Sequence, residues 1–302
     1  MAAFPPVIPQ RMNFMKRPLA IFAGSLVLIL PGISPAVDPA PTPPAMEKTS
    51  PQVDAPSSSE KETASATSPS MNKLILEAIH RMPTGGGYSV KKDAMVAIRS
   101  AIVVEGAELQ VTPEAARPSY CSEATYLAFL KVIETLLSRH ELQLTSAELR
   151  MFLVGTQADG EGIWGRWNAN GPGTARLFYE LGLGPNFPTI DSAQPGDFLK
   201  VFWTDEIGAK EFGHSVIYLG RRMTPQGEVV RFWSSNIKVG YSEKEVPLAK
   251  MKRVVVSRFE HPENLHRLLQ LPKKDAFLAS MLTESCPPEV MLTKVGIKNS
   301  QP

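Results

Sequence analysis

The chain has 302 residues, of which 43% are hydrophobic, so it can build a core of ordinary size for one domain, or two. Its formal net charge is only +2 at pH 7 and its basic residues form no cluster, which excludes a nucleic-acid partner. Many of its 27 prolines lie in the first seventy residues, and this skew predicts a boundary near residue 70.

Residues 1–36 have the pattern of a secretory signal peptide. Lys16 and Arg17 form a basic start, residues 19–30 are apolar, and small residues precede a cleavage point after Ala36. The apolar run is too short to span a bilayer comfortably, so we expect no stable membrane span after cleavage. An uncleaved anchor is the alternative. The pattern predicts an exported protein, either periplasmic or extracellular.

Residues 37–70 consist largely of Pro, Ala, Ser, Thr and Glu, with almost no aromatic residue. Such a segment buries too little apolar surface to offset its ordering entropy, so we expect a disordered tether. The chemistry is then expected in one folded domain over residues 71–285, followed by a loose tail over residues 286–302.

The folded part shows two hydrophobic periods, one after the other. Apolar residues at three- and four-residue steps predict helices over 71–82, 91–102, 118–140, 147–154 and 174–181. Runs rich in β-forming residues then predict strands over 197–204, 215–220, 228–235 and 253–259. A last helix is expected over 262–281. Helices followed by an antiparallel sheet indicate the α+β class.

Cys121 lies in the first turn of the longest predicted helix, after the start signal of Pro118 and Ser119. Free backbone N–H groups and the positive end of the helix dipole favour a thiolate at this position. Cys121 is therefore a candidate nucleophile. The alternative is a structural cysteine that is buried as a small hydrophobic residue.

His214 begins a predicted strand, and the hairpin that follows returns a polar cluster of Ser234, Ser235 and Asn236 alongside it. With the turn centred on residues 225–226, opposed residue numbers sum to roughly 451, within the uncertainty of strand register. A thiol nucleophile needs a base, and the base needs a group that orients its ring. Cys121, His214 and Asn236 fit these three roles, with Ser234 and Ser235 left as alternatives for the third.

Residues 160–171 contain two tryptophans and two asparagines among glycines, which is typical of a surface loop that binds a ligand. Trp164, Trp167 and Asn168, together with Tyr120 beside the cysteine, are the candidate substrate-binding residues. The alternative is a plain loop whose tryptophans pack into the core.

Segments 118–123, 194–203 and 213–236 together resemble the NlpC-type and CHAP-type cell-wall cysteine peptidases and amidases. The resemblance implies a reduced papain-like fold, in which the cysteine helix packs on an antiparallel sheet that carries the histidine. It also implies cleavage of a peptide or amide bond in cell-wall peptide or glycopeptide, without a cofactor. The opening Tyr120-Cys121-Ser122-Glu123 departs from the Asp-Cys-Ser-Gly type that is common in these families.

The two cysteines allow a different hypothesis. In an exported chain, Cys121 and Cys286 could form a disulfide. That bond would remove the nucleophile and leave a non-catalytic domain that binds a ligand or the cell wall. A metal site is not expected, because no paired His/Cys ligand spacing occurs.

Overall fold

A computed structural model describes residues 70–298 of the chain. The predicted signal peptide and all of the predicted tether except Ser70 lie outside these residues. Within the described part, no helix combines the length and apolar character needed to cross a membrane.

The helices before residue 182 follow the predicted apolar periods closely, with α5 as an addition. They are α1 Met71–His80, α2 Lys92–Ser100, α3 Cys121–Ser138, α4 Ser146–Arg150, α5 Gly162–Trp167, α6 Gly173–Leu181, α7 Ala276–Ser280 and α8 Pro288–Lys294. Short 3-10 turns, η1 to η4, cover Pro113–Ala115, Ile190–Ser192, Leu248–Lys250 and Pro262–Gln270. The five predicted helices before residue 182 are confirmed, and α5 occupies a segment predicted to be a loop.

One seven-stranded sheet has the order β1-β8-β7-β6-β5-β9-β4, and its neighbouring strands are antiparallel. Its strands are β1 Gly85–Gly86, β4 Asn186–Phe187, β5 Phe198–Phe202, β6 Gly213–Thr224, β7 Gly227–Asn236, β8 Gly240–Pro247 and β9 Arg253–Ser257. A separate hairpin joins β2 Ile102–Glu105 to β3 Glu108–Val111. Helices and this large antiparallel sheet confirm the α+β class.

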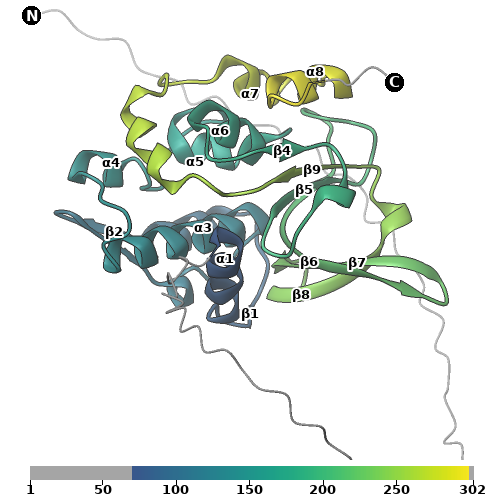
Figure 1. Ribbon diagram of the computed structural model, residues 1–302, viewed down its shortest axis with the longest axis horizontal. Helices are drawn as coiled ribbons and strands as arrows, with labels where there is room; N and C mark the ends of the chain where they lie inside the picture. Colours follow the sequence, from purple (N-terminus) through teal and green to yellow (C-terminus); the bar gives the residue numbers. More distant parts are fainter. Residues whose placement is uncertain (1–69, 299–302) are drawn as a thin grey trace, which may run out of the picture. The chain divides into compact units, whose positions relative to one another are not determined.

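The helix α3 is the centre of the main core (Figure 1). Its residues from Ala124 to Leu130 are buried along the whole circumference, and it packs against α1, β6 and β7. Phe198, Ile217 and Trp233 project from the sheet into the same core. The opposite face of the sheet buries a second, smaller apolar cluster. Side chains of alternating strand residues therefore divide between two cores.

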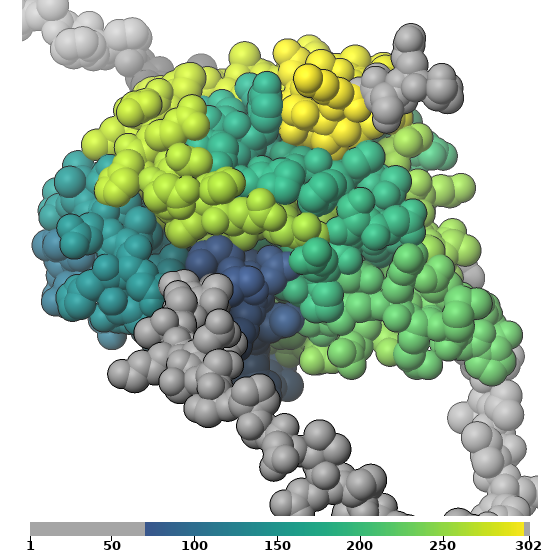
Figure 2. All heavy atoms as spheres, in the orientation of Figure 1, coloured from purple at the N-terminus to yellow at the C-terminus, as the bar shows by residue number. Residues whose placement is uncertain are grey.

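Figure 2 shows the dark-blue α1 segment directly against the strand region of the chain, and two hydrogen bonds fix this contact. Asn72 Nδ2 donates to Pro195 O at 3.0 Å and to Asp197 Oδ1 at 2.8 Å. Arg258 also pairs with the buried Asp197 carboxylate, at 2.9 Å. The turn that begins β5 is thereby tied to both α1 and β9.

The hairpin of β6 and β7 turns between Thr224 and Gly227, as predicted, and its opposed residues sum to 451 near the turn. A bulge between Tyr218 and Gly220 changes the sum to 450, so that Ile217 is opposite Trp233. Continued to the start of β6, this register places His214 opposite Asn236. A shift of one residue in the register of β6 would have placed the His214 side chain on the other face of the sheet.

The C-terminal part corrects two predictions. The expected helix over 262–281 is divided into η4 and α7 by Pro272, which cannot continue a helix hydrogen-bond ladder. The tail expected to be loose from residue 286 instead forms α8, and Met291 in this helix and Val295 directly after it are each 1% exposed. They pack with Phe202 of β5 and with Val255 of β9. Burial of these side chains holds the segment on the domain.

Candidate active site

The segment before α3 is held between two parts of the sheet. Ser119 Oγ donates to Ser235 Oγ at 2.9 Å, and Ser235 Oγ donates to Ser119 O at 2.9 Å. On the other side, Ser119 exchanges backbone hydrogen bonds with Gly87 and Ser89. These contacts fix the position at which Cys121 starts the helix.

Glu123 completes the helix start. Its Oε2 accepts from the backbone N–H of Tyr120 at 3.1 Å, which satisfies one of the free donors of the first turn. The side chain is fully buried, and its Oε1 has no hydrogen-bond partner among the described residues. Burial and the charges of Cys121 and Asp93 raise the pKa of Glu123 to about 8, so a neutral carboxyl predominates at neutral pH.

Cys121 faces the place where β6 and β7 separate. Their ladder ends at Ile217 and Trp233, and beyond this pair Ser234 Oγ donates to Ser215 O at 2.7 Å. The half-buried thiol of Cys121 lies near the backbone N–H of Ser215 and the ring of His214, and both lower its pKa. The helix start and the open end of the hairpin thus bring the two residues together.

Asn236 holds the far side of the histidine ring. Its Oδ1 lies 3.2 Å from His214 Nε2. Its Nδ2 donates to Ser242 O at 2.9 Å and to Ser242 Oγ at 3.1 Å, which turns the amide oxygen toward the ring. Because Oδ1 can only accept, the neutral ring carries its proton on Nε2 and leaves Nδ1 unprotonated. Ser234 and Ser235, the other candidates for this role, bond to backbone oxygens instead.

The electrostatics of the site favour a thiolate. Burial is the largest single influence and raises the pKa of the Cys121 thiol, while the charge of His214 and its hydrogen bond lower it. The Ser215 backbone N–H and the charge of Lys200 lower the pKa further, and the result is a pKa of about 7. A large fraction of the thiol is therefore ionised at neutral pH, which is what a cysteine nucleophile requires.

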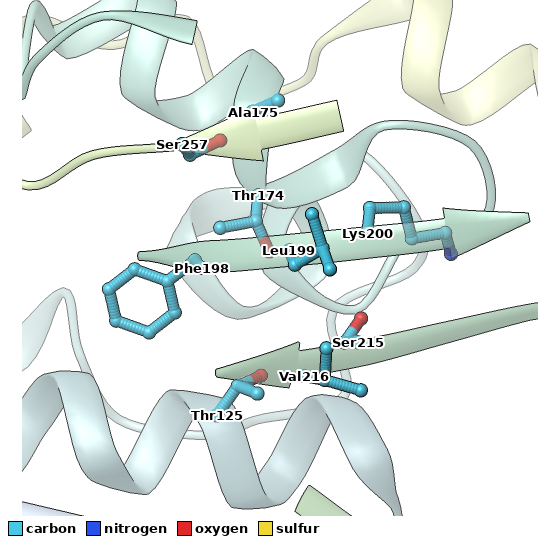
Figure 3. Close-up of a pocket in the computed structure, with 9 residues that line it drawn as sticks. All are labelled: Thr125, Thr174, Ala175, Phe198, Leu199, Lys200, Ser215, Val216 and Ser257. Atoms are coloured by element: carbon cyan, nitrogen blue, oxygen red, sulfur yellow. The ribbon is translucent and has the colours of Figure 1, made fainter. Parts of the chain in front are cut away.

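Cys121 opens onto a surface cleft with a volume of about 460 Å³, large enough for part of a peptide. A separate cavity beneath Lys200 and Ser215 (Figure 3) measures only about 10 Å³, about the space of one water molecule. The cleft is thus the candidate substrate site. Its lining includes Tyr88, Val90, Tyr120, Asp159, Asn168, Asn170, Lys200, Glu211, Phe212 and Leu282.

Lys200 is a charged residue of the cleft that belongs to an otherwise apolar strand. Figure 3 shows it on β5, beside Ser215 of β6, and the two residues are partners in the ladder. Its Nζ lies 2.6 Å from Glu211 Oε1. Glu211 Oε2 accepts from the backbone N–H groups of Gly171 and Gly208. The ammonium is thus fixed across the ladder from the residue whose N–H contacts the Cys121 sulfur.

Two of the predicted substrate-binding residues lie at the cleft in specific contacts. Asn168 Oδ1 accepts from Ser122 Oγ at 2.5 Å, and the Tyr120 hydroxyl donates to Met95 Sδ at 3.2 Å. Tyr88, which the sequence interpretation did not single out, also borders the cleft, and burial raises its pKa to about 12. Its hydroxyl is therefore a proton-bearing donor at neutral pH.

The prediction that Trp164 and Trp167 lie in a surface loop is wrong. Trp164 and Trp167 belong to α5 and are each 1% exposed. Both rings pack on Tyr126, and Trp167 also stacks on Phe129 and donates from Nε1 to Thr125 Oγ1 at 3.2 Å. An edge of Trp167 borders the cleft, whereas Trp164 is a core residue. Burial of two large aromatic surfaces outweighs the loop tendency of the surrounding glycines.

The disulfide hypothesis is not supported, because Cys121 and Cys286 are both free thiols. Cys286 packs against the cluster that contains Met291 and Ile207, where burial raises the pKa of its thiol. The two cysteines thus have opposite pKa shifts, and only Cys121 faces a histidine.

Lys200, Glu211 and Asp159 were not predicted as site residues. Lys200 left a signal in the sequence, since it is the one charge in the strand Phe198–Phe202. Glu211 and Asp159 lie in loops, where charged residues are ordinary, and no local pattern marks them.

Comparisons with known proteins find no match: no family model and no curated protein matches the sequence, and no solved structure matches the fold.

Proposed function

We propose that this chain is an exported cysteine hydrolase that cleaves peptide or amide bonds in cell-wall peptide, using Cys121 and His214. The observation that carries the proposal is the contact between a low-pKa thiol at a helix start and a histidine oriented by an amide oxygen. Nucleophile, base and orienting group are the three parts of a thiol hydrolase.

The proposed reaction follows from this geometry. The Cys121 thiolate attacks the substrate carbonyl, and backbone N–H groups at the start of α3 stabilise the oxyanion. His214, which has taken the thiol proton, returns it to the nitrogen of the leaving amine as the C–N bond breaks. A water molecule, deprotonated by His214, then hydrolyses the thioester and restores the thiol. Asn236 keeps the imidazole ring in place through both steps.

The arrangement also supports a reduced papain-like fold as a proposal. The cysteine begins a buried helix, and that helix packs on an antiparallel sheet whose strand bears the histidine. Cell-wall peptide as substrate, and export by a signal peptide over residues 1–36, come from the sequence resemblance and the N-terminal pattern.

The test is hydrolysis of purified peptidoglycan and its soluble peptides by the full chain, with new amines detected by mass spectrometry. Cys121→Ala and His214→Ala should each lower the rate by at least ~10³-fold. The matched control, Cys286→Ala, should keep the wild-type rate, because Cys286 lies outside the cleft. Undiminished hydrolysis by Cys121→Ala would refute the proposed nucleophile. Absence of amine release by a protein with a reactive Cys121 would refute the proposed substrate.

A further inference from the structure

Three large apolar side chains lie exposed around the cleft that contains Cys121. Val90 is 69% exposed, Phe212 is 59% exposed and Leu282 is 52% exposed, and all three line the cleft. They come from three separate segments: the one before α2, the one between β5 and β6, and the one between α7 and α8. The fold therefore assembles the group from distant parts of the sequence. We call these three residues the apolar rim.

The cleft combines a largely buried ion pair with exposed apolar side chains. Its ion pair is largely buried, with the side chain of Lys200 13% exposed and that of Glu211 5% exposed. The apolar rim is exposed, whereas the apolar residues Trp167 and Ala169 of the same lining are buried. Single exposed hydrophobic residues are common, but a group beside one cleft is typical of a binding surface. Covering such surface releases roughly 25 cal/mol for each Å² of apolar area.

We propose that the apolar rim binds a bulky apolar residue or acyl group that flanks the bond cut by Cys121. The inference rests on the proposed function, since it concerns the substrate of the same cleft. It narrows the substrate class: amides with an apolar group beside the reacting carbonyl are preferred over those with a small polar group.

The experiment measures alkylation of Cys121, which requires no turnover. The probes are iodoacetamide, N-phenethyl iodoacetamide and N-(2-hydroxyethyl) iodoacetamide. With each probe the thiolate sulfur bonds to the methylene carbon while the C–I bond breaks and iodide leaves. Second-order rate constants are obtained for the full chain by mass spectrometry of the Cys121 peptide, which keeps Cys286 out of the measurement.

In the wild-type protein the phenethyl probe should react about 5- to 50-fold faster than the hydroxyethyl probe, because its ring is covered by the rim. The substitutions Phe212→Ser and Leu282→Ser should each reduce this ratio at least ~3-fold, and the double variant should reduce it further. The iodoacetamide rate should stay constant in all of them. Because both side chains are more than half exposed, the variants should keep the wild-type fold, checked by thermal unfolding.

Matched controls come from exposed apolar residues elsewhere. Met223 is 74% exposed at the end of β6, and Leu269 is 55% exposed in η4; neither lines the cleft. Met223→Ser and Leu269→Ser should leave the probe ratio unchanged. An equal loss of the ratio in these controls would overturn the proposal.

The outcomes separate this inference from the proposed function. A wild-type ratio near one, or a ratio unchanged in the double variant Phe212→Ser and Leu282→Ser, overturns the apolar rim even if Cys121 hydrolyses amides. A probe preference that depends on the rim, in a protein without amide hydrolysis, supports the rim and refutes the hydrolase. A Cys121 that reacts with none of the probes overturns both.

Discussion

Side chains on two neighbouring strands lower the pKa of the Cys121 thiol. His214 acts through its charge and a hydrogen bond, and Lys200 acts through its charge. Lys200 is paired with Glu211. The ionisation of the Cys121 thiol thus depends in part on a lysine held in an ion pair, and Coulomb's law predicts effects of opposite sign for the two partners.

Substitution of either ion-pair partner should thus move the thiol pKa in opposite directions. Lys200→Met removes a positive charge, so the thiol pKa should rise above about 7 and alkylation at pH 6 should slow. Glu211→Gln removes a negative charge, so the pKa should fall and alkylation at pH 6 should accelerate. We expect shifts of about half a unit to one unit, measured from the pH profile of the iodoacetamide rate.

Two controls accompany this measurement. Lys200→Arg retains the charge and should keep the wild-type profile, while Lys210→Met removes an exposed charge and should change little. If the ion pair is merely structural, Lys200→Met and Glu211→Gln will shift the profile in the same direction or leave it in place.

At the scale of elements, the site depends on a helix that starts where a hairpin opens. α3 supplies the cysteine, β6 the histidine and β7 the asparagine, and the bulge between Tyr218 and Gly220 sets the register that joins the last two. The small helix α5 supports this arrangement from behind α3, with both of its tryptophans against Tyr126. Trp164 contributes to stability, while Trp167 also borders the cleft.

Trp164→Ala should therefore destabilise the protein instead of changing the cleft. Removal of a ring that is 1% exposed leaves a cavity, and we expect the free energy of unfolding to fall by about 3–5 kcal/mol in urea denaturation. Val96→Ala, at a position 53% exposed on α2, should change it by less than ~0.5 kcal/mol. If the Trp164→Ala variant keeps the wild-type stability but changes the ratio of phenethyl to hydroxyethyl alkylation, Trp164 belongs to a ligand-binding loop after all.

At the scale of the described domain, the chain returns its C-terminal segment to the central sheet. Met291 of α8 and Val295 directly after it pack against β9 and against β5, the strand that carries Lys200. The domain boundary expected at residue 285 is accordingly placed too early, because the core extends through this helix.

Met291→Ala tests this extension of the core. The side chain is 1% exposed, and its truncation should lower the free energy of unfolding by about 2–5 kcal/mol. Val290, the neighbouring residue on the same helix, is 38% exposed, and Val290→Ala should cost less than ~1 kcal/mol. If urea denaturation gives the Met291→Ala variant the same free energy of unfolding as the wild-type protein, the C-terminal segment is loose, as first predicted.

Local patterns were sufficient for the fold class and for most helices. The apolar period of residues 118–140 identified α3, and the start signal at Pro118 and Ser119 placed Cys121 in its first turn. The β-rich runs after residue 196 identified β5, β6, β7 and β9, and the turn at 224–227 limited the partner of His214 to about residues 235–237. The accepting amide oxygen of Asn236 then favoured that residue. β8 was missed, because its run of Ser, Glu and Lys is polar where a strand pattern is sought.

Other features depended on contacts between segments far apart in the chain. Whether Trp164 faces solvent or Tyr126, whether Met291 is loose or buried, and whether Cys121 meets His214 or Cys286 are decided by packing. The apolar rim likewise joins residues 90, 212 and 282. A periodic pattern reports which side of an element is apolar, but it does not identify the partner, since hydrophobic burial is non-directional. Side-chain shape and strand register select that partner when the whole chain packs.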